Sequence, residues 1–172
     1  MAGGSKSKTK GSTFERDLAK FLGATFDGSF IRSANSGAFV GGSNSFRKAT
    51  LSKGQTTSLK GDLVAPDHMP KFVVEAKFYA DFRFHQLLQP GPVAQLDTWV
   101  EQCLIAIDPG DFWVIVFKIN LRGIFVAIPE GFADHFVFGN HCRYTGAHGS
   151  FRICDMKEFF TANKAPVLKL SA

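Results

Sequence analysis

Two acidic residues and a lysine are spaced so that neighbouring strands of a sheet can bring them together. Asp62 lies in an apolar run from Leu59 to Ala65, and Glu75 and Lys77 both lie in a second run from Lys71 to Tyr79. Because successive side chains of a strand point to opposite faces, Glu75 and Lys77 share one face and the apolar residues of the run share the other. If the two runs pair as strands, we expect Asp62 to stand beside Glu75.

Such a group of side chains predicts a site for a hard divalent cation. Asp62 and Glu75, together with the main-chain carbonyl of Ala76, would supply oxygen ligands and leave positions open for water. A bound cation activates water and stabilises the charge that develops on a phosphodiester during in-line attack. Lys77 would orient or deprotonate that water, or neutralise the phosphate. Two close carboxylates repel each other without a cation, so we expect the site to be occupied.

Positive charge is concentrated at one end of the chain. The 172 residues carry a net charge of +5; residues 1–60 hold ten Lys and Arg against three Asp and Glu, and the remainder holds ten against twelve. This asymmetry suits contact with a polyanion such as nucleic acid. The candidate contacts are Lys10, Arg32, Ser33, Arg47, Lys48, Lys53 and Lys60. We expect no membrane association, because the chain shows neither a basic amphipathic helix nor a membrane-spanning stretch. Three widely separated cysteines indicate reduced thiols and an intracellular, cytoplasmic protein.

The elements that must position these residues follow from apolar periodicity. Residues 1–11 are predicted to be a flexible basic arm, and 12–172 a single domain. A helix should begin at Ser12 and end at Gly23, followed by a short strand at 30–32 and a basic, Gly/Ser-rich loop or hairpin over 37–59.

The second half of the chain predicts one long helix and two long strands. The helix spans about Pro92 to Ile107, and its apolar stripe is expected to contain Val93, Leu96, Val100, Leu104 and Ile107. Strands follow at 112–119 and 123–128. Residues 129–172 form a C-terminal extension with a last helix near 156–162. This order of elements predicts an α/β fold with one central mixed sheet flanked by helices.

The acidic residues and the lysine also resemble a known signature. Gly61-Asp62, twelve intervening residues and Glu75-Ala76-Lys77 are similar to the PD-(D/E)xK nuclease motif, with Gly61 where the family often has proline. More narrowly, residues 10–120 resemble the archaeal-type Holliday-junction resolvases. The matching features are Lys10-Gly11-Ser12, Glu15, Arg32 and Ser36-Gly37.

The resemblance implies a restriction-endonuclease-like fold and a Mg²⁺-dependent endonuclease, with Mn²⁺ as a substitute. It implies a homodimer that resolves four-way (Holliday) junctions or other branched DNA by paired nicks. Such a nuclease would suit a virus or mobile element that must remove branches from its replicated DNA. Glu15 would join Asp62 and Glu75 as a metal-site residue. Ser36, or else Ser33, would match the family's active-site serine. Gln95, four residues before Trp99, resembles a glutamine–aromatic element of related nucleases and would contact DNA.

Two alternatives keep the same residues but change the function. One is a general or restriction-like endonuclease that cuts duplex DNA, and the other is a DNA-binding protein without catalysis. Glu15 also has a structural alternative, since Ser12-Thr13-Phe14-Glu15 is a capping-box pattern in which Glu15 bonds back to the amide of Ser12.

Overall fold

The architecture is a single mixed sheet with helices on both faces. The computed structural model describes residues 3–33 and 60–172, with the side chains of 10–33 and 60–172. Within these residues seven strands lie in the order β1-β2-β3-β4-β5-β7-β6, and only β3 and β4 run parallel. The strands are β1 (Ile31–Arg32), β2 (Leu63–Val64), β3 (Phe72–Tyr79), β4 (Phe112–Ile119), β5 (Gly123–Pro129), β6 (His141–Gly146) and β7 (Gly149–Asp155). This confirms the predicted α/β class, and the arrangement is consistent with a restriction-endonuclease-like fold.

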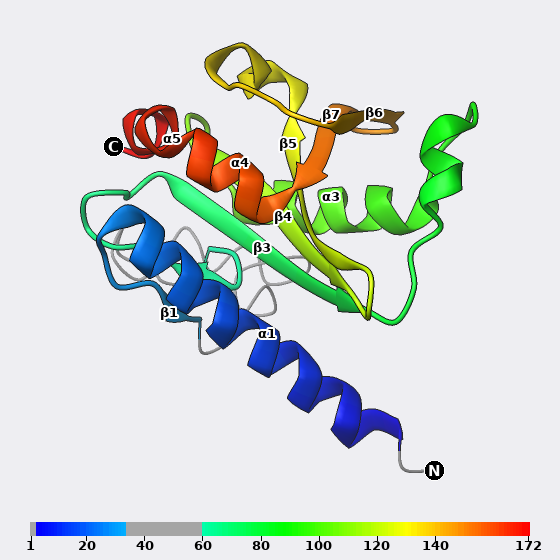
Figure 1. Ribbon diagram of the computed structural model, residues 1–172, viewed down its shortest axis with the longest axis horizontal. Helices are drawn as coiled ribbons and strands as arrows, with labels where there is room; N and C mark the ends of the chain where they lie inside the picture. The colour runs from blue at the N-terminus through cyan, green and yellow to red at the C-terminus, as the bar shows by residue number, and fades with distance from the viewer. Residues whose placement is uncertain (1–2, 34–59) are drawn as a thin grey trace.

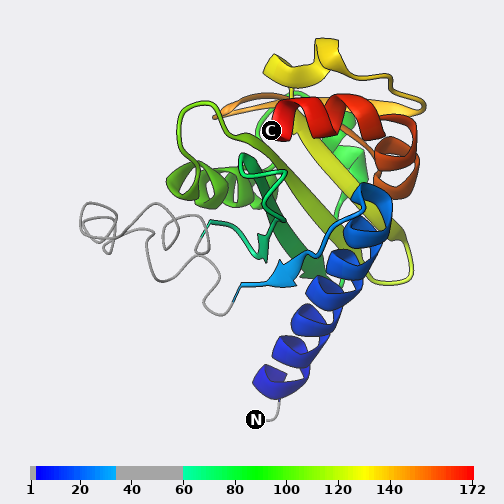
Figure 2. The same cartoon turned by 90° about the vertical axis from the view of Figure 1, so that its left-hand side faces the viewer.

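The helices form one layer on each face of the sheet (Figures 1 and 2). On one face lie α1 (Gly3–Phe26), α4 (Met156–Ala162) and α5 (Lys164–Ser171). On the other lie α3 (Ala94–Ala106) and the short 3₁₀ helix η2 (Phe84–Leu88), and a second 3₁₀ helix, η3 (Glu130–His135), follows β5. The crossover from β3 to β4 runs through α3, as a parallel pair of strands requires.

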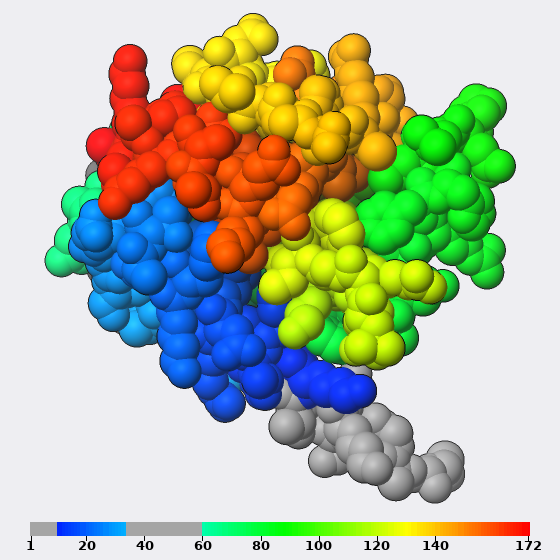
Figure 3. All heavy atoms as spheres, viewed as in Figure 1, coloured from blue at the N-terminus to red at the C-terminus, as the bar shows by residue number. Residues whose placement is uncertain are grey.

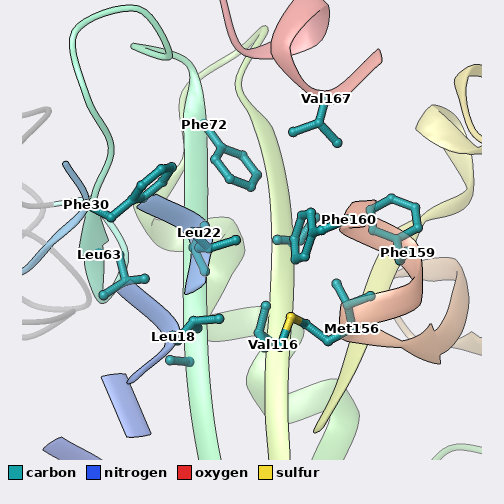
Figure 4. Packing of buried hydrophobic residues seen from close by; sticks show 14 of the residues in the cluster. Leu18, Leu22, Phe30, Leu63, Phe72, Val116, Met156, Phe159, Phe160 and Val167 are labelled. Carbon is teal, nitrogen blue, oxygen red and sulfur yellow. The ribbon is translucent and has the colours of Figure 1, made fainter. Parts of the chain in front are cut away.

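Apolar side chains fill both spaces between the helices and the sheet. Figure 4 shows the α1 side, where Leu18 and Leu22 pack toward β3 and Phe160 of α4 approaches β4. On the other side Trp99 of α3 packs on Phe117 of β4 with ring centroids 5.4 Å apart. The alternation of β3 therefore sends Phe72, Val74 and Ala76 into the α1 layer. The charged residues Glu75 and Lys77 alternate with these and share the α3 side with Val73.

The apolar stripe of α3 differs from the predicted one. Trp99 and Cys103 are buried, whereas Leu104 is 40% exposed. The helix is rotated so that the large indole ring, rather than Leu104, enters the core. Burial of an aromatic ring of this size removes more apolar area from water than burial of a leucine, which explains the rotation.

Helix α1 begins at Gly3, so the predicted start at Ser12 is wrong. Residues 3–11, predicted as a flexible arm, continue the helix. Nucleation is the step of helix formation that costs most free energy. Burial of the turns from Phe14 to Phe26 offsets this cost, and each further residue then adds a hydrogen bond. Because Ser12 lies inside the helix, the capping-box interpretation of Glu15 is also wrong.

The C-terminal extension completes the sheet. The hairpin of β6 and β7 pairs with β5, and α4 spans the predicted residues 156–162. The sequence pattern did not predict β6, β7 or α5. No helix within the described residues has the length and apolarity needed to cross a membrane.

Candidate active site

Asp62 is fixed beside Glu75 by the pairing of β2 with β3. Leu63 is the antiparallel partner of Val74. Asp62, one residue before Leu63, therefore lies opposite Glu75, one residue after Val74. The main-chain nitrogen of Asp62 donates to the carbonyl of Val74 at 2.9 Å, and its Oδ2 accepts from the nitrogen of Ala76 at 2.8 Å. This confirms the expected neighbourhood of the two carboxylates.

The turn before Asp62 depends on glycine. Gly61 has a φ of +63°, and a Cβ at this position would lie 2.6 Å from the carbonyl oxygen of Val74. The left-handed conformation and the close backbone approach both exclude a side chain. Gly61 therefore sets the path by which Asp62 enters β2.

Lys77 lies on the same face as Glu75 and is held at two points. Its Nζ donates to Oε1 of Glu75 at 2.7 Å and to Oε1 of Gln102, on α3, at 2.7 Å. Burial opposes the charge of the ammonium, but the Glu75 carboxylate outweighs it and raises the pKa of Lys77 above its usual value. Lys77 is thus cationic at neutral pH, with two acceptors directing it.

Glu75 is a carboxylate that its surroundings disfavour in the ionised form. It is 6% exposed, and burial together with the charge of Asp62 raises its pKa to about 7 in spite of the neighbouring Lys77. The negative charges of two such neighbouring carboxylates repel each other, and a divalent cation bound between them would stabilise both. The part of the chain that the structure describes holds no cluster of three His, Cys, Asp or Glu suited to a metal. A pair of carboxylates plus waters nevertheless suits Mg²⁺, which keeps much of its hydration shell in proteins.

The structure does not bring Glu15 together with Asp62 and Glu75. Glu15 forms an ion pair with Arg32 of β1, and its charge is the weakest of the contributions that act on Glu75. Arg32 pairs with Leu63, whose side chain belongs to the α1 layer. Glu15 is thus paired with Arg32 in this structure, and its role as a third metal ligand stays a prediction.

Lys60 has a structural environment rather than a DNA-facing one. It is 8% exposed, and its Nζ lies 2.7 Å from Asp111 and 2.8 Å from Asp108. Burial disfavours its charge, yet the two carboxylates raise its pKa above the usual value. The ammonium of Lys60 is therefore engaged by two acidic side chains next to the strand that follows α3, and its phosphate contact stays a prediction.

Removing this ammonium should destabilise the protein. Lys60→Ala leaves Asp111, which is 7% exposed, without its cation. We expect the free energy of unfolding to fall by about 2 kcal/mol, because breaking one partner of a buried pair costs more than the pair contributes. Thermal unfolding measures this, with the exposed Lys71→Ala as the control, which should change stability by less than about 0.5 kcal/mol. An unchanged melting temperature combined with weaker DNA binding would instead show that Lys60 contacts DNA.

The other predicted DNA contacts have different environments. Lys10 is exposed on α1 and Gln95 is half-buried on α3. Ser33 is 1% exposed, and its main-chain nitrogen donates to the carbonyl of Asp62 at 2.9 Å, so it positions the site from β1. Ser36, Arg47, Lys48 and Lys53 lie outside the described residues.

Gln102 is the site residue that the sequence interpretation missed. It follows Gln95 by seven residues, close to two helical turns, so both occupy one side of α3. Only Gln102 reaches Lys77. The signal was present as a second glutamine at helical spacing, but the aromatic residue four positions after Gln95 drew the interpretation to Gln95 alone. Trp99 is a core residue, as expected of a large aromatic side chain on this helix.

Gln102→Ala should lower the cleavage rate by about tenfold. The reason is that Lys77 loses one of the two acceptors that orient its ammonium, so it donates less effectively to the reacting groups. Gln95→Ala is the matched control on the same helix and should leave the rate unchanged. Single-turnover cleavage with saturating protein measures both variants. Equal effects of the two substitutions would contradict the assigned role of Gln102.

Comparison with known proteins agrees with this geometry. A family model described as "Phage putative PDDEXK endonuclease" matches residues 6–164. The match includes most of the C-terminal extension, up to residue 164, for which the sequence interpretation named no counterpart. Searches of curated proteins and of solved structures found no match. Since the match spans nearly the whole chain and includes Asp62, Glu75 and Lys77, the chain belongs to this phage family of the PD-(D/E)xK nuclease superfamily.

Proposed function

We propose that this nuclease hydrolyses phosphodiester bonds of branched DNA, four-way junctions first of all, as a Mg²⁺-dependent endonuclease. The observation that carries the catalytic part is the convergence of Asp62, Glu75 and Lys77 on one face of adjoining strands. The family supports DNA as the substrate of a nuclease and divalent metal as its usual cofactor.

The chain's own residues divide the chemistry between them. Asp62 and Glu75, with the carbonyl of Ala76, would hold a divalent cation that supplies an activated water and stabilises the charge of the phosphate. Glu75 and Gln102 orient the Nζ of Lys77. Because Lys77 is cationic at neutral pH, it acts as a donor to a phosphate oxygen or to the attacking water rather than as a base.

The preference for branched DNA and the homodimer rest on a narrower observation. The residues Lys10-Gly11-Ser12, Glu15 and Arg32 resemble those of archaeal-type resolvases, and Arg32 and Glu15 form an ion pair at the edge of the sheet next to β2. A two-fold dimer with one such edge per subunit would nick two strands symmetrically.

The proposal is tested with equimolar end-labelled four-way junction, duplex and single-stranded DNA of shared sequence, with Mg²⁺, with Mn²⁺ and with EDTA. We expect paired symmetric nicks in the junction alone, lost in EDTA and in Lys77→Ala. Equal cutting of duplex would replace the junction preference with general endonuclease activity. Binding without cleavage of any substrate, under all metal conditions, would leave only a DNA-binding role. Sedimentation showing a monomer both free and on DNA would remove the paired-nick mechanism.

A further inference from the structure

An open groove lies between α1 and the edge strand β1. It has a volume of about 730 Å³, and its walls include Arg16 and Lys20 from α1 and Arg32 from β1. Figure 2 shows the chain turning back from the C-terminal end of α1, beside the helix, and into β1. Hereafter we call this the α1–β1 groove.

The charge of the α1–β1 groove is strongly unbalanced. Arg16, Lys20 and Arg32 face one carboxylate, Asp27, and that carboxylate is already paired with Lys164 at 2.6 Å. Arg16 and Lys20 are exposed, and no ion pair within the described residues engages either of them. Their spacing of four residues places both on one side of the helix. Among the described residues the groove therefore presents two cations outside any ion pair, Arg16 and Lys20, and a third at its β1 end, Arg32, which is paired with Glu15.

The other flank of α1 provides an internal comparison. A pocket of about 350 Å³ lies there between α1, α4 and the β4–β5 region, on the side seen in Figure 3. Its charged residues are two cations, Lys118 and Lys157, and two carboxylates, Asp17 and Asp155. One helix thus separates a charge-balanced pocket from a cationic one, which shows that the excess belongs to the α1–β1 groove and not to the helix as a whole.

The α1–β1 groove also adjoins the candidate active site. Arg32 is the strand partner of Leu63, the residue directly after Asp62. The next residue of the chain, Ser33, donates its main-chain N–H to the carbonyl of Asp62. The groove therefore ends at the strand that pairs with the segment carrying Asp62.

We propose that the α1–β1 groove binds the DNA backbone outside the scissile phosphate, with Arg16 and Lys20 as phosphate contacts that no sequence motif indicates. This inference rests on the proposed nuclease function. Phosphate contacts of this kind position a strand without reading its sequence, and they add to affinity mainly through the release of counterions. The exposed Ile31, 57% accessible on the β1 wall, gives the sugar face of such a strand an apolar surface.

The test is DNA binding in EDTA, where cleavage plays no part, measured by fluorescence anisotropy over a range of salt concentrations. We expect Arg16→Ala/Lys20→Ala to weaken binding by about tenfold at physiological salt. The slope of log K against log salt should become shallower by about 2, close to one for each phosphate that no longer meets a cation. Alanine is a strong helix former, so circular dichroism should show an unchanged fold. Arg16→Lys/Lys20→Arg should keep the wild-type slope.

The matched control removes two exposed lysines of α4 and α5 that do not line the groove, Lys157→Ala/Lys169→Ala, with the same change in net charge. An equal loss of affinity in this control, or an unchanged salt slope in the groove variant, would overturn the proposal. The two proposals can fail separately. If the wild type cuts no DNA but the groove variant still has a shallower slope, the groove stands and the nuclease proposal falls. If the wild type cuts DNA and the slope is unchanged, the groove alone falls.

Discussion

Asp62→Asn lowers DNA cleavage by about 1,000-fold, which corresponds to about 4 kcal/mol of lost transition-state stabilisation. The amide oxygen of asparagine can still accept the hydrogen bond from the nitrogen of Ala76, so the strand pairing is preserved and only the anionic ligand is lost. Single-turnover cleavage with Mg²⁺ measures the effect. DNA binding in EDTA should stay within about twofold of the wild type.

The control for this substitution is Asp134→Asn, the same chemical change at an exposed residue of η3. It should cut DNA at the wild-type rate. Cleavage by Asp62→Asn within about tenfold of the wild type would show that the metal site lies elsewhere, and the convergence of Asp62 with Glu75 would then be structural.

Glu75→Gln abolishes cleavage and at the same time stabilises the metal-free protein. The pKa of Glu75 is about 7 in the folded state, above the usual value of 4.5, because the carboxylate is buried beside Asp62. Between these pH values the unfolded chain releases the proton while the folded protein keeps it, so wild-type stability falls as the pH rises from 4.5 to about 7. Glutamine removes this penalty and can still accept from Lys77.

We therefore expect the melting temperature of Glu75→Gln in EDTA to exceed that of the wild type by several degrees at about pH 8, an effect of about 1–3 kcal/mol. The difference should vanish below pH 4.5, where the wild-type carboxyl is protonated in both states. Mg²⁺ should raise the melting temperature of the wild type only, since the variant lacks one ligand. A stability gain of equal size on the two sides of this pH range would contradict the electrostatic explanation and indicate a packing effect.

The central part of the fold was predictable because its signals are local. Strands β3 and β4 and helix α4 follow from short apolar runs and periodicity, and the alternation of β3 is enough to put Glu75 and Lys77 on one face. The pairing of Asp62 with Glu75 needed only one short turn. These elements required no knowledge of distant parts of the chain.

The contacts that the sequence could not predict join distant residues. Lys60 looks like an exposed cation in a basic segment, but its partner Asp111 lies 51 residues away. Glu15 has the right helical position for a metal ligand, yet Arg32 from β1 takes its carboxylate. The choice between Gln95 and Gln102 depends on which turn of α3 crosses Lys77. That crossing is set by the packing of Trp99 against β4 and not by the sequence of α3 alone.

The crossover that joins β3 to β4 through α3 has a consequence for how the active site is assembled. Asp62, Glu75, Lys77 and Gln102 all come from one continuous stretch of chain, and the contacts among them close short loops. Short loops carry a small entropic cost, so this stretch can organise early in folding. The layer formed by α1, α4 and α5 would then pack against a candidate site that is already assembled. Within such a division, α1 and its cationic groove can diversify toward new DNA shapes while the chemistry stays in place.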